Sequence, residues 1–194
     1  MTTSSIFKRF FFISLIALLF STGVHAQKRA AIKTNTLYWA TLSPNIGGEI
    51  VLRDNFTFEL AASFNPFTFG ERQWQHVMAT AEFRYWVFEP FSSHFFGLHY
   101  VVGTYNVGGF SLPFNTFDGL STRRARGNAN GVGLTYGHNW IIGNRLALEA
   151  LIGVGYARFN YDTYPLGSNG TSFGSNSRNY FGPTRIGLSL VRVF

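Results

Sequence analysis

The stretch FTFELAASF, residues 56–64, alternates apolar and polar side chains along its whole length. One parity carries the apolar residues Phe56, Phe58, Leu60, Ala62 and Phe64. The other parity carries Thr57, Glu59, Ala61 and Ser63. Because successive side chains of a strand point to opposite faces, this spacing predicts a β-strand with one apolar face and one polar face.

The same alternation recurs along the rest of the chain. It predicts eight strands, at about 31–42, 46–52, 56–64, 77–87, 94–105, 130–142, 145–157 and 181–194. Short connections at 53–55, 88–93 and 143–144 alternate with long ones at 65–76, 106–129 and 158–180, and 43–45 is a short exception. Short turns at one end and long loops at the other are typical of membrane barrels. We therefore predict an all-β, eight-stranded antiparallel up-and-down transmembrane β-barrel.

The composition agrees with this class of protein. Aromatic residues make up 18% of the chain and charged residues only 13%, whereas soluble proteins carry about 25% charged residues. Aromatic side chains favour strands and collect at membrane interfaces. The chain has no cysteine, which excludes disulfides, thiolate metal sites and a cysteine nucleophile.

The N-terminus has the features of a secretory signal peptide. Lys8 and Arg9 precede an apolar run over residues 10–20, and Val24-His25-Ala26 has small residues where a signal peptidase reads. The run is much shorter than the roughly 20 residues that a membrane-spanning helix needs. We expect cleavage after Ala26, which leaves residues 27–194 as a single barrel domain in the outer membrane of a Gram-negative bacterium. Such barrels present a C-terminal aromatic residue, here Phe194, to the outer-membrane assembly machinery.

The polar faces of the predicted strands favour a crowded lumen over a solvated surface. A soluble lipocalin-like barrel or sandwich would instead turn its apolar faces inward. The polar faces are rich in small residues, and their mid-strand charges have both signs, so that they can pair inside a barrel. The predicted lumen charge network contains Glu49, Glu59, Glu82, Arg84, Glu149 and Arg185, with Lys33 as a further candidate. Since eight strands leave room only for side chains, we expect a filled lumen and no channel.

The predicted connection 106–129 carries Arg123, Arg124 and Arg126 with Asp118 as its only acid. Guanidinium groups match phosphate and carboxylate oxygens bidentately. The three arginines are therefore a candidate contact with lipopolysaccharide or an acidic glycan, and the alternative is a solvated loop whose charges keep it soluble.

The sequence predicts no catalytic, cofactor-binding or metal-binding residue. Its mature histidines are His76, His94, His99 and His138, and none belongs to a His-x-Ser pair with a downstream acid. The glycine-rich piece 127–137 lacks the Lys-Ser/Thr of a phosphate loop. We expect a monomer with a structural or surface-interaction role. A lipid A-modifying enzyme or an adhesion or appendage accessory stays an alternative, and scattered cations on an exported chain argue against nucleic acid.

Four strings carry a resemblance to a known family. They are KTNTLYWATLSPNIGGE (33–49), FRYWVFEPFSSHFFGLHYVVGTYNVGG (83–109), YGHNWIIGNRLALEALIGVGYARFNYDTY (136–164) and YFGPTRIGLSL (180–190). They resemble an uncharacterised family of Bacteroidota outer-membrane β-barrel proteins, known only as a domain of unknown function. The resemblance implies a signal peptide and an eight-stranded barrel and assigns no site residue. Many members place a cysteine pair in the final outer loop, which 158–180 lacks.

Overall fold

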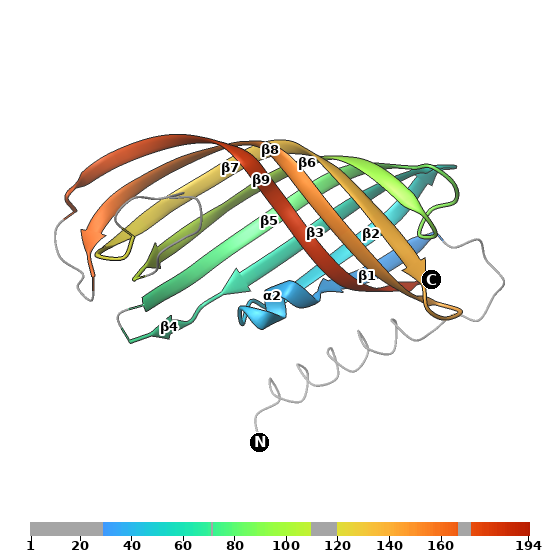
Figure 1. Cartoon of the computed structure of the whole chain (residues 1–194), viewed down its shortest axis with the longest axis horizontal. Coiled ribbons are helices and arrows are strands. Elements are labelled where there is room, and N and C mark those ends of the chain that lie inside the picture. Colours follow the sequence, from blue (N-terminus) through green and yellow to red (C-terminus); the bar gives the residue numbers. More distant parts are fainter. Residues whose placement is uncertain (1–28, 71, 110–119, 167–171) are drawn as a thin grey trace, which may run out of the picture.

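The computed structural model describes residues 29–70, 72–109, 120–166 and 172–194 (Figure 1). The expected signal peptide, residues 1–26, lies outside the described residues. The described chain forms one short helix, α2 (Thr36–Ala40), and a single sheet. The strands are β1 (Ala30–Asn35), β2 (Asn45–Arg53), β3 (Phe56–Asn65), β4 (Thr68–Phe69), β5 (Arg72–Trp86), β6 (His94–Gly108), β7 (Arg123–Ile141), β8 (Leu146–Pro165) and β9 (Gly174–Val193).

Eight of these strands close into a ring, and the two-residue β4 is an appendage of β5. Every pairing is antiparallel; β1 pairs with β9, and β3 pairs with β5, which closes the circle. The prediction of an all-β, eight-stranded antiparallel fold is therefore confirmed. The ring has two unlike ends. We call the end that holds the short connections 54–55, 87–93 and 142–145 the turn end, and the opposite end, which holds α2, the far end.

The first predicted strand, 31–42, is wrong in its second half, because β1 stops at Asn35 and α2 follows. The Asn35 side chain explains the change of structure. Its amide oxygen accepts a hydrogen bond from the Leu37 backbone N–H at 3.1 Å, which is the bond that begins a helix at an Asn N-cap.

The long predicted loops are also wrong in extent, because strands extend into all three of them. β5 begins at Arg72, β7 begins at Arg123, β8 continues to Pro165 and β9 begins at Gly174. Near the far end the outward side chains change from apolar to polar, as at Asn128 and Arg158. The apolar–polar alternation that marks a strand is therefore lost there, although backbone pairing continues.

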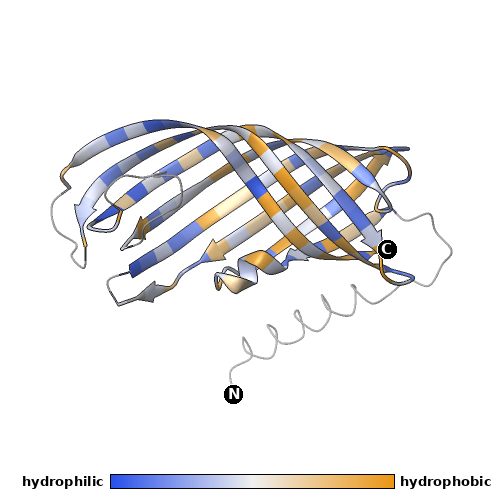
Figure 2. Ribbon diagram, in the orientation of Figure 1, coloured by the Kyte–Doolittle hydropathy of each residue, from blue (hydrophilic) through white to orange (hydrophobic). Residues whose placement is uncertain are grey.

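The ring is inverted in polarity relative to an ordinary protein core. Large apolar side chains cover its outside, and Leu60, Leu98, Leu134 and Ile186 are 55–69% exposed. The inside holds charged and polar side chains with almost no exposure. In Figure 2, hydrophobic residues are frequent on the part of the ring that lies nearest the mark C, and hydrophilic residues are frequent on the far ends of β7, β8 and β9. The parity of the predicted strand 56–64 is therefore the one that the sequence pattern indicates, with the polar face inside.

An apolar cluster fills the interior at the turn end. Its members are Ala31, Trp86, Phe91, Phe95, Ala147, Leu151, Val191 and Val193. The Trp86 ring packs on Phe95 with centroids 4.8 Å apart and on Phe91 at 5.8 Å. Trp86 also donates its indole N–H to the Thr57 hydroxyl at 2.9 Å, so its polar atom is satisfied inside the cluster. We call this apolar cluster the plug.

No helix in the described part of the chain is long and apolar enough to cross a membrane.

Candidate functional site

Seven charged side chains converge inside the ring from six different strands. They are Lys33 of β1, Glu49 of β2, Glu59 of β3, Glu82 and Arg84 of β5, Glu149 of β8 and Arg185 of β9. All seven occupy the inward parity of their strands, and six of them are at most 5% exposed. The structure thus brings together the six residues of the sequence-predicted network and Lys33, its further candidate. We call these seven residues the charge layer.

Arg84 lies at the centre of the charge layer. Its Nε donates to Glu82 Oε1 at 2.8 Å, and its Nη1 donates to Glu49 Oε2 at 2.9 Å and to Glu149 Oε2 at 2.8 Å. Its Nη2 forms an ion pair with Glu59. The guanidinium also stacks 4.2 Å above the centroid of the Phe95 ring, which belongs to the apolar cluster below. One guanidinium therefore joins four carboxylates to the plug.

Two further cations complete the layer. Lys33 Nζ lies 2.6 Å from Glu49 Oε2, 3.1 Å from Glu59 Oε2 and 2.9 Å from Glu149 Oε2. Arg185 pairs with Glu59 and Glu82. Four carboxylates and three cations give the layer a formal charge of −1. Buried charges are stable only when they are paired and hydrogen-bonded, and each carboxylate here meets at least two cations.

Neutral side chains surround the charged ones. Thr57 donates to Glu49, and Thr135 Oγ1 donates to Glu82 Oε2 at 3.1 Å. The His99 ring lies between two threonines, with Nδ1 2.8 Å from Thr135 Oγ1 and Nε2 2.9 Å from Thr184 Oγ1. The sequence does not predict the threonine partners, because their position across from His99 depends on the register of β6, β7 and β9.

The described histidines lie in different surroundings, with His76 on β5 opposite Asn65 of β3. Each nitrogen of His99 is held by a threonine, while His94 and His138 lie on the outer face with ring centroids 4.1 Å apart. His94 Nδ1 is 2.7 Å from the Tyr136 hydroxyl. Within the described residues none of these histidines hydrogen-bonds to a serine, and no group of three His, Asp or Glu side chains is placed to hold a metal ion.

The three arginines predicted for an outer loop belong to strand β7, which corrects that prediction, and they are not equivalent. Arg124 is buried, and its guanidinium donates to Gln73 Oε1 at 3.3 Å. The guanidinium carbon lies 4.9 Å from the centroid of the Tyr164 ring. Arg123 is exposed and lies 5.5 Å from the centroid of Phe173. Arg126 is exposed and lines a polar groove of about 480 Å³. The groove also contains Asn128, Asn160, Asp162, Ser175 and Asn176.

A closed ring with an ion-paired interior and an apolar outside defines an all-β, barrel-like protein. Residues 10–194 match the family described as "Protein of unknown function (DUF3575)", and the chain belongs to that family. This membership confirms the resemblance to a domain of unknown function. No curated protein and no solved structure matches the chain.

Proposed function

We propose that this protein is an outer-membrane β-barrel with a sealed lumen that acts through surfaces beyond the lipid. The observation that carries the proposal is the inverted polarity of the ring. Leu98 on the outside is 55% exposed, whereas the Arg84 guanidinium inside is fully buried. Soluble monomers rarely expose contiguous apolar patches above a few hundred Å². The apolar outer surface therefore favours contact with the lipid chains of a membrane over contact with water.

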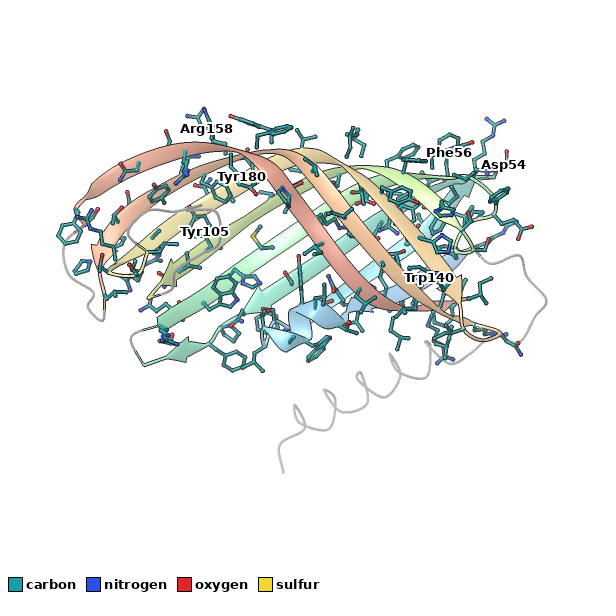
Figure 3. All side chains as sticks on the ribbon, in the orientation of Figure 1. Asp54, Phe56, Tyr105, Trp140, Arg158 and Tyr180 are labelled. Atoms are coloured by element: carbon teal, nitrogen blue, oxygen red, sulfur yellow. The ribbon has the colours of Figure 1, made fainter. Side chains whose placement is uncertain are left out.

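The dimensions of the shorter strands support the same proposal. β2 and β3 have 9 and 10 residues, and a tilted strand needs about 9–11 residues to cross the hydrocarbon layer. Aromatic side chains lie at both limits of this span, as expected for the two membrane interfaces. Phe88 and Trp140 are exposed at the turn end, and Phe64 and Tyr156 are exposed toward the far end. Figure 3 shows Trp140 and Phe56 near the turn end, with Asp54 in the adjoining turn.

The proposed orientation places the turn end in the periplasm and the far end outside the cell. The signal peptide is removed after Ala26, and Phe194 engages the outer-membrane assembly machinery during insertion. The barrel is a monomer, because β1 and β9 close its ring and the side chains of Asn35 and Thr36 bind the β9 carbonyls just beyond the last β1 pair. The far ends of β7, β8 and β9 continue beyond the span, and Arg126 on this projecting sheet contacts lipopolysaccharide.

Fractionation and gel mobility test this proposal together. Mature protein should begin at Gln27 and fractionate with the outer membrane. The antiparallel pairing of eight strands around the ring resists unfolding in detergent, so an unboiled sample should migrate differently from a boiled one in detergent gels. Recovery in the soluble fraction with identical mobility in both samples would instead identify a water-soluble fold.

A further inference from the structure

A pocket lies between the charge layer and the far end of the ring. It has a volume of about 440 Å³, which is within the range of small-molecule sites, about 300–1,000 Å³. We call this space the outer chamber. Its lining is mainly apolar and aromatic and includes Leu37, Met78, Tyr105, Ala129, Phe159 and Ile186. Tyr105 is 9% exposed, and Figure 3 shows it toward the end of the ring away from Trp140.

Aromatic packing gives the outer chamber a fixed wall. Tyr105 meets Phe159 edge to face at 5.9 Å, and Phe159 meets Tyr180 at 6.3 Å. Leu120, from the connection between β6 and β7, is 4% exposed and packs in one cluster with Tyr105 and Ala129. The chamber therefore has one side lined by packed aromatic and apolar side chains.

The mouth of the chamber follows from the unequal lengths of β1 and β9. β1 pairs with β9 only from Ala31↔Val193 to Asn35↔Ser189, whereas β9 extends to Gly174. Beyond Ser189, within the described residues, β9 has β8 as its only strand neighbour. The wall of the ring is thus one strand short beside the chamber.

Helix α2 stands where β1 would continue, and it bounds this missing part of the wall. The Thr36 hydroxyl donates to the Leu188 carbonyl at 2.7 Å, and Asn35 Nδ2 donates to the Ile186 carbonyl at 3.0 Å. Leu37 of α2 and Ile186 of β9 both line the chamber, and they are 38% and 57% exposed. The apolar lining therefore continues through the mouth onto the apolar outside of the ring.

We propose that the outer chamber binds one acyl chain of a membrane lipid, which enters sideways between α2 and β9. This inference rests on the proposed membrane function. A polar metabolite would need several converging polar groups. The described lining residues include His76 and the hydroxyl side chains of Thr41, Ser43 and Ser63, but no Lys, Arg, Asp or Glu, and the lining is mainly apolar. Among the polar ones, the Ser43 hydroxyl already accepts from Asn65 Nδ2 at 3.0 Å. A hydrocarbon chain needs no polar partner. In the proposed membrane the lipid acyl chains lie directly outside the mouth of the chamber.

Tryptophan quenching by brominated lipid tests the proposal, because the chain has its own controls. Trp74 lines the chamber, Trp86 lies in the plug at 0% exposure, and Trp140 is on the outside at 46% exposure. Full-length variants that retain one of these three tryptophans, with the other tryptophans changed to Phe, are reconstituted in phosphatidylcholine vesicles whose acyl chains carry bromine. We expect Trp74 to lose fluorescence to an extent comparable with Trp140, and Trp86 to lose none.

A blocking variant separates chain entry from quenching through the wall. Ala129 is 5% exposed and lines the chamber, so Ala129→Phe in the Trp74-only protein fills the space. It should restore Trp74 fluorescence, and it should leave the quenching of Trp140 unchanged when it is introduced into the Trp140-only protein. Unboiled gel mobility confirms that each variant has folded. If Trp74 behaves like Trp86, or if its quenching survives the block, the chamber does not hold lipid. If Trp140 itself is not quenched, the membrane proposal fails instead.

Discussion

At the scale of single residues, Arg84 has the most connections to the other charges of the ring. Its guanidinium contacts Glu49, Glu59, Glu82 and Glu149, and all five side chains are at most 1% exposed. A buried ion pair is often no more stable than an apolar replacement of the whole network. Removal of one partner is different, because it leaves the remaining charges buried without compensation.

Arg84→Ala should therefore destabilise the protein by about 3–5 kcal/mol, the usual cost of breaking a buried ion pair. The variant keeps four carboxylates but only two cations, Lys33 and Arg185. The measurement is the free energy of unfolding by urea for the protein in lipid vesicles or detergent.

The matched control is Arg53→Ala, because the Arg53 side chain is 85% exposed and pairs with Asp54 only at 3.6 Å. Exposed pairs of this kind contribute about 0–1 kcal/mol. Equal urea midpoints for the two variants would show that Arg84 does not hold the charge layer together.

The members of the charge layer could be predicted from the sequence, but their contacts could not. A Glu or Arg in the middle of an alternating strand, on the polar parity, must lie on the inner face once that face is inside. The parity therefore identified Glu59, Glu82 and Arg84 without knowledge of any neighbour. The two threonines beside His99 gave no such signal, because Thr is common on any strand face.

At the scale of elements, the last residue of β1 contacts both helix α2 and the edge of strand β9. Asn35 Oδ1 accepts from the backbone N–H groups of Leu37 and Leu188, and Asn35 Nδ2 donates to the Ile186 carbonyl. One side chain therefore caps α2 and also continues the pairing of β9 beyond the last β1 residue. The alternating pattern missed this change, since TLYWA (36–40) contains residues that suit a strand as well as a helix.

Asn35→Ala should loosen α2 and the adjacent part of β9 while the rest of the ring stays intact. The loss of an Asn N-cap costs about 1 kcal/mol. Hydrogen exchange should accelerate at the amides of Leu37 and Leu188 and stay unchanged at the paired amides of β6 and β7. Asn179→Ala is the matched control, because Asn179 accepts from the Tyr156 hydroxyl at 2.8 Å on another part of β9. Equal protection of Leu188 in both variants would contradict the role given to Asn35.

The far end of β7 gives a prediction that distinguishes its arginines. Arg126→Ser should weaken binding to purified lipopolysaccharide by about tenfold, since a charge-assisted hydrogen bond contributes about 1.5–3 kcal/mol. The effect should shrink as salt rises, because at 0.15 M charges are screened beyond about 8 Å. Arg124→Ser should instead destabilise the sheet, because Arg124 is buried against Tyr164.

The control for lipopolysaccharide binding is Arg53→Ser, which removes an exposed cation at the opposite end of the ring. A titration at low ionic strength in which Arg126→Ser binds as well as the unaltered protein would remove this surface from the proposed function. The sequence could not separate the arginines, because it predicted a loop where β7 and β8 pair from Arg123↔Pro165 onward.

At the scale of the whole molecule, the interior is closed by two consecutive layers. The apolar cluster around Trp86 and Phe95 fills the turn end, and the charge layer lies directly above it. Planar-bilayer recordings should therefore show no stable open pore, with the unboiled gel mobility of the same sample as proof that the ring is closed. A reproducible ohmic conductance would mean that the two layers leave a continuous water path.

The pairing of β1 with β9, which we call the seam, closes the ring. It contains five residue pairs and joins opposite ends of the chain. Lys33 and Arg185 belong to the two strands of this seam, so a sheet that lacks both strands has four carboxylates and only Arg84 to oppose them. Such an unfinished sheet repels itself, and the missing cations arrive with the strands that close it. Closure brings in Lys33 and Arg185 and so changes the formal charge inside from −3 to −1. We therefore expect the ring to close in one cooperative step, without a populated intermediate that lacks the seam.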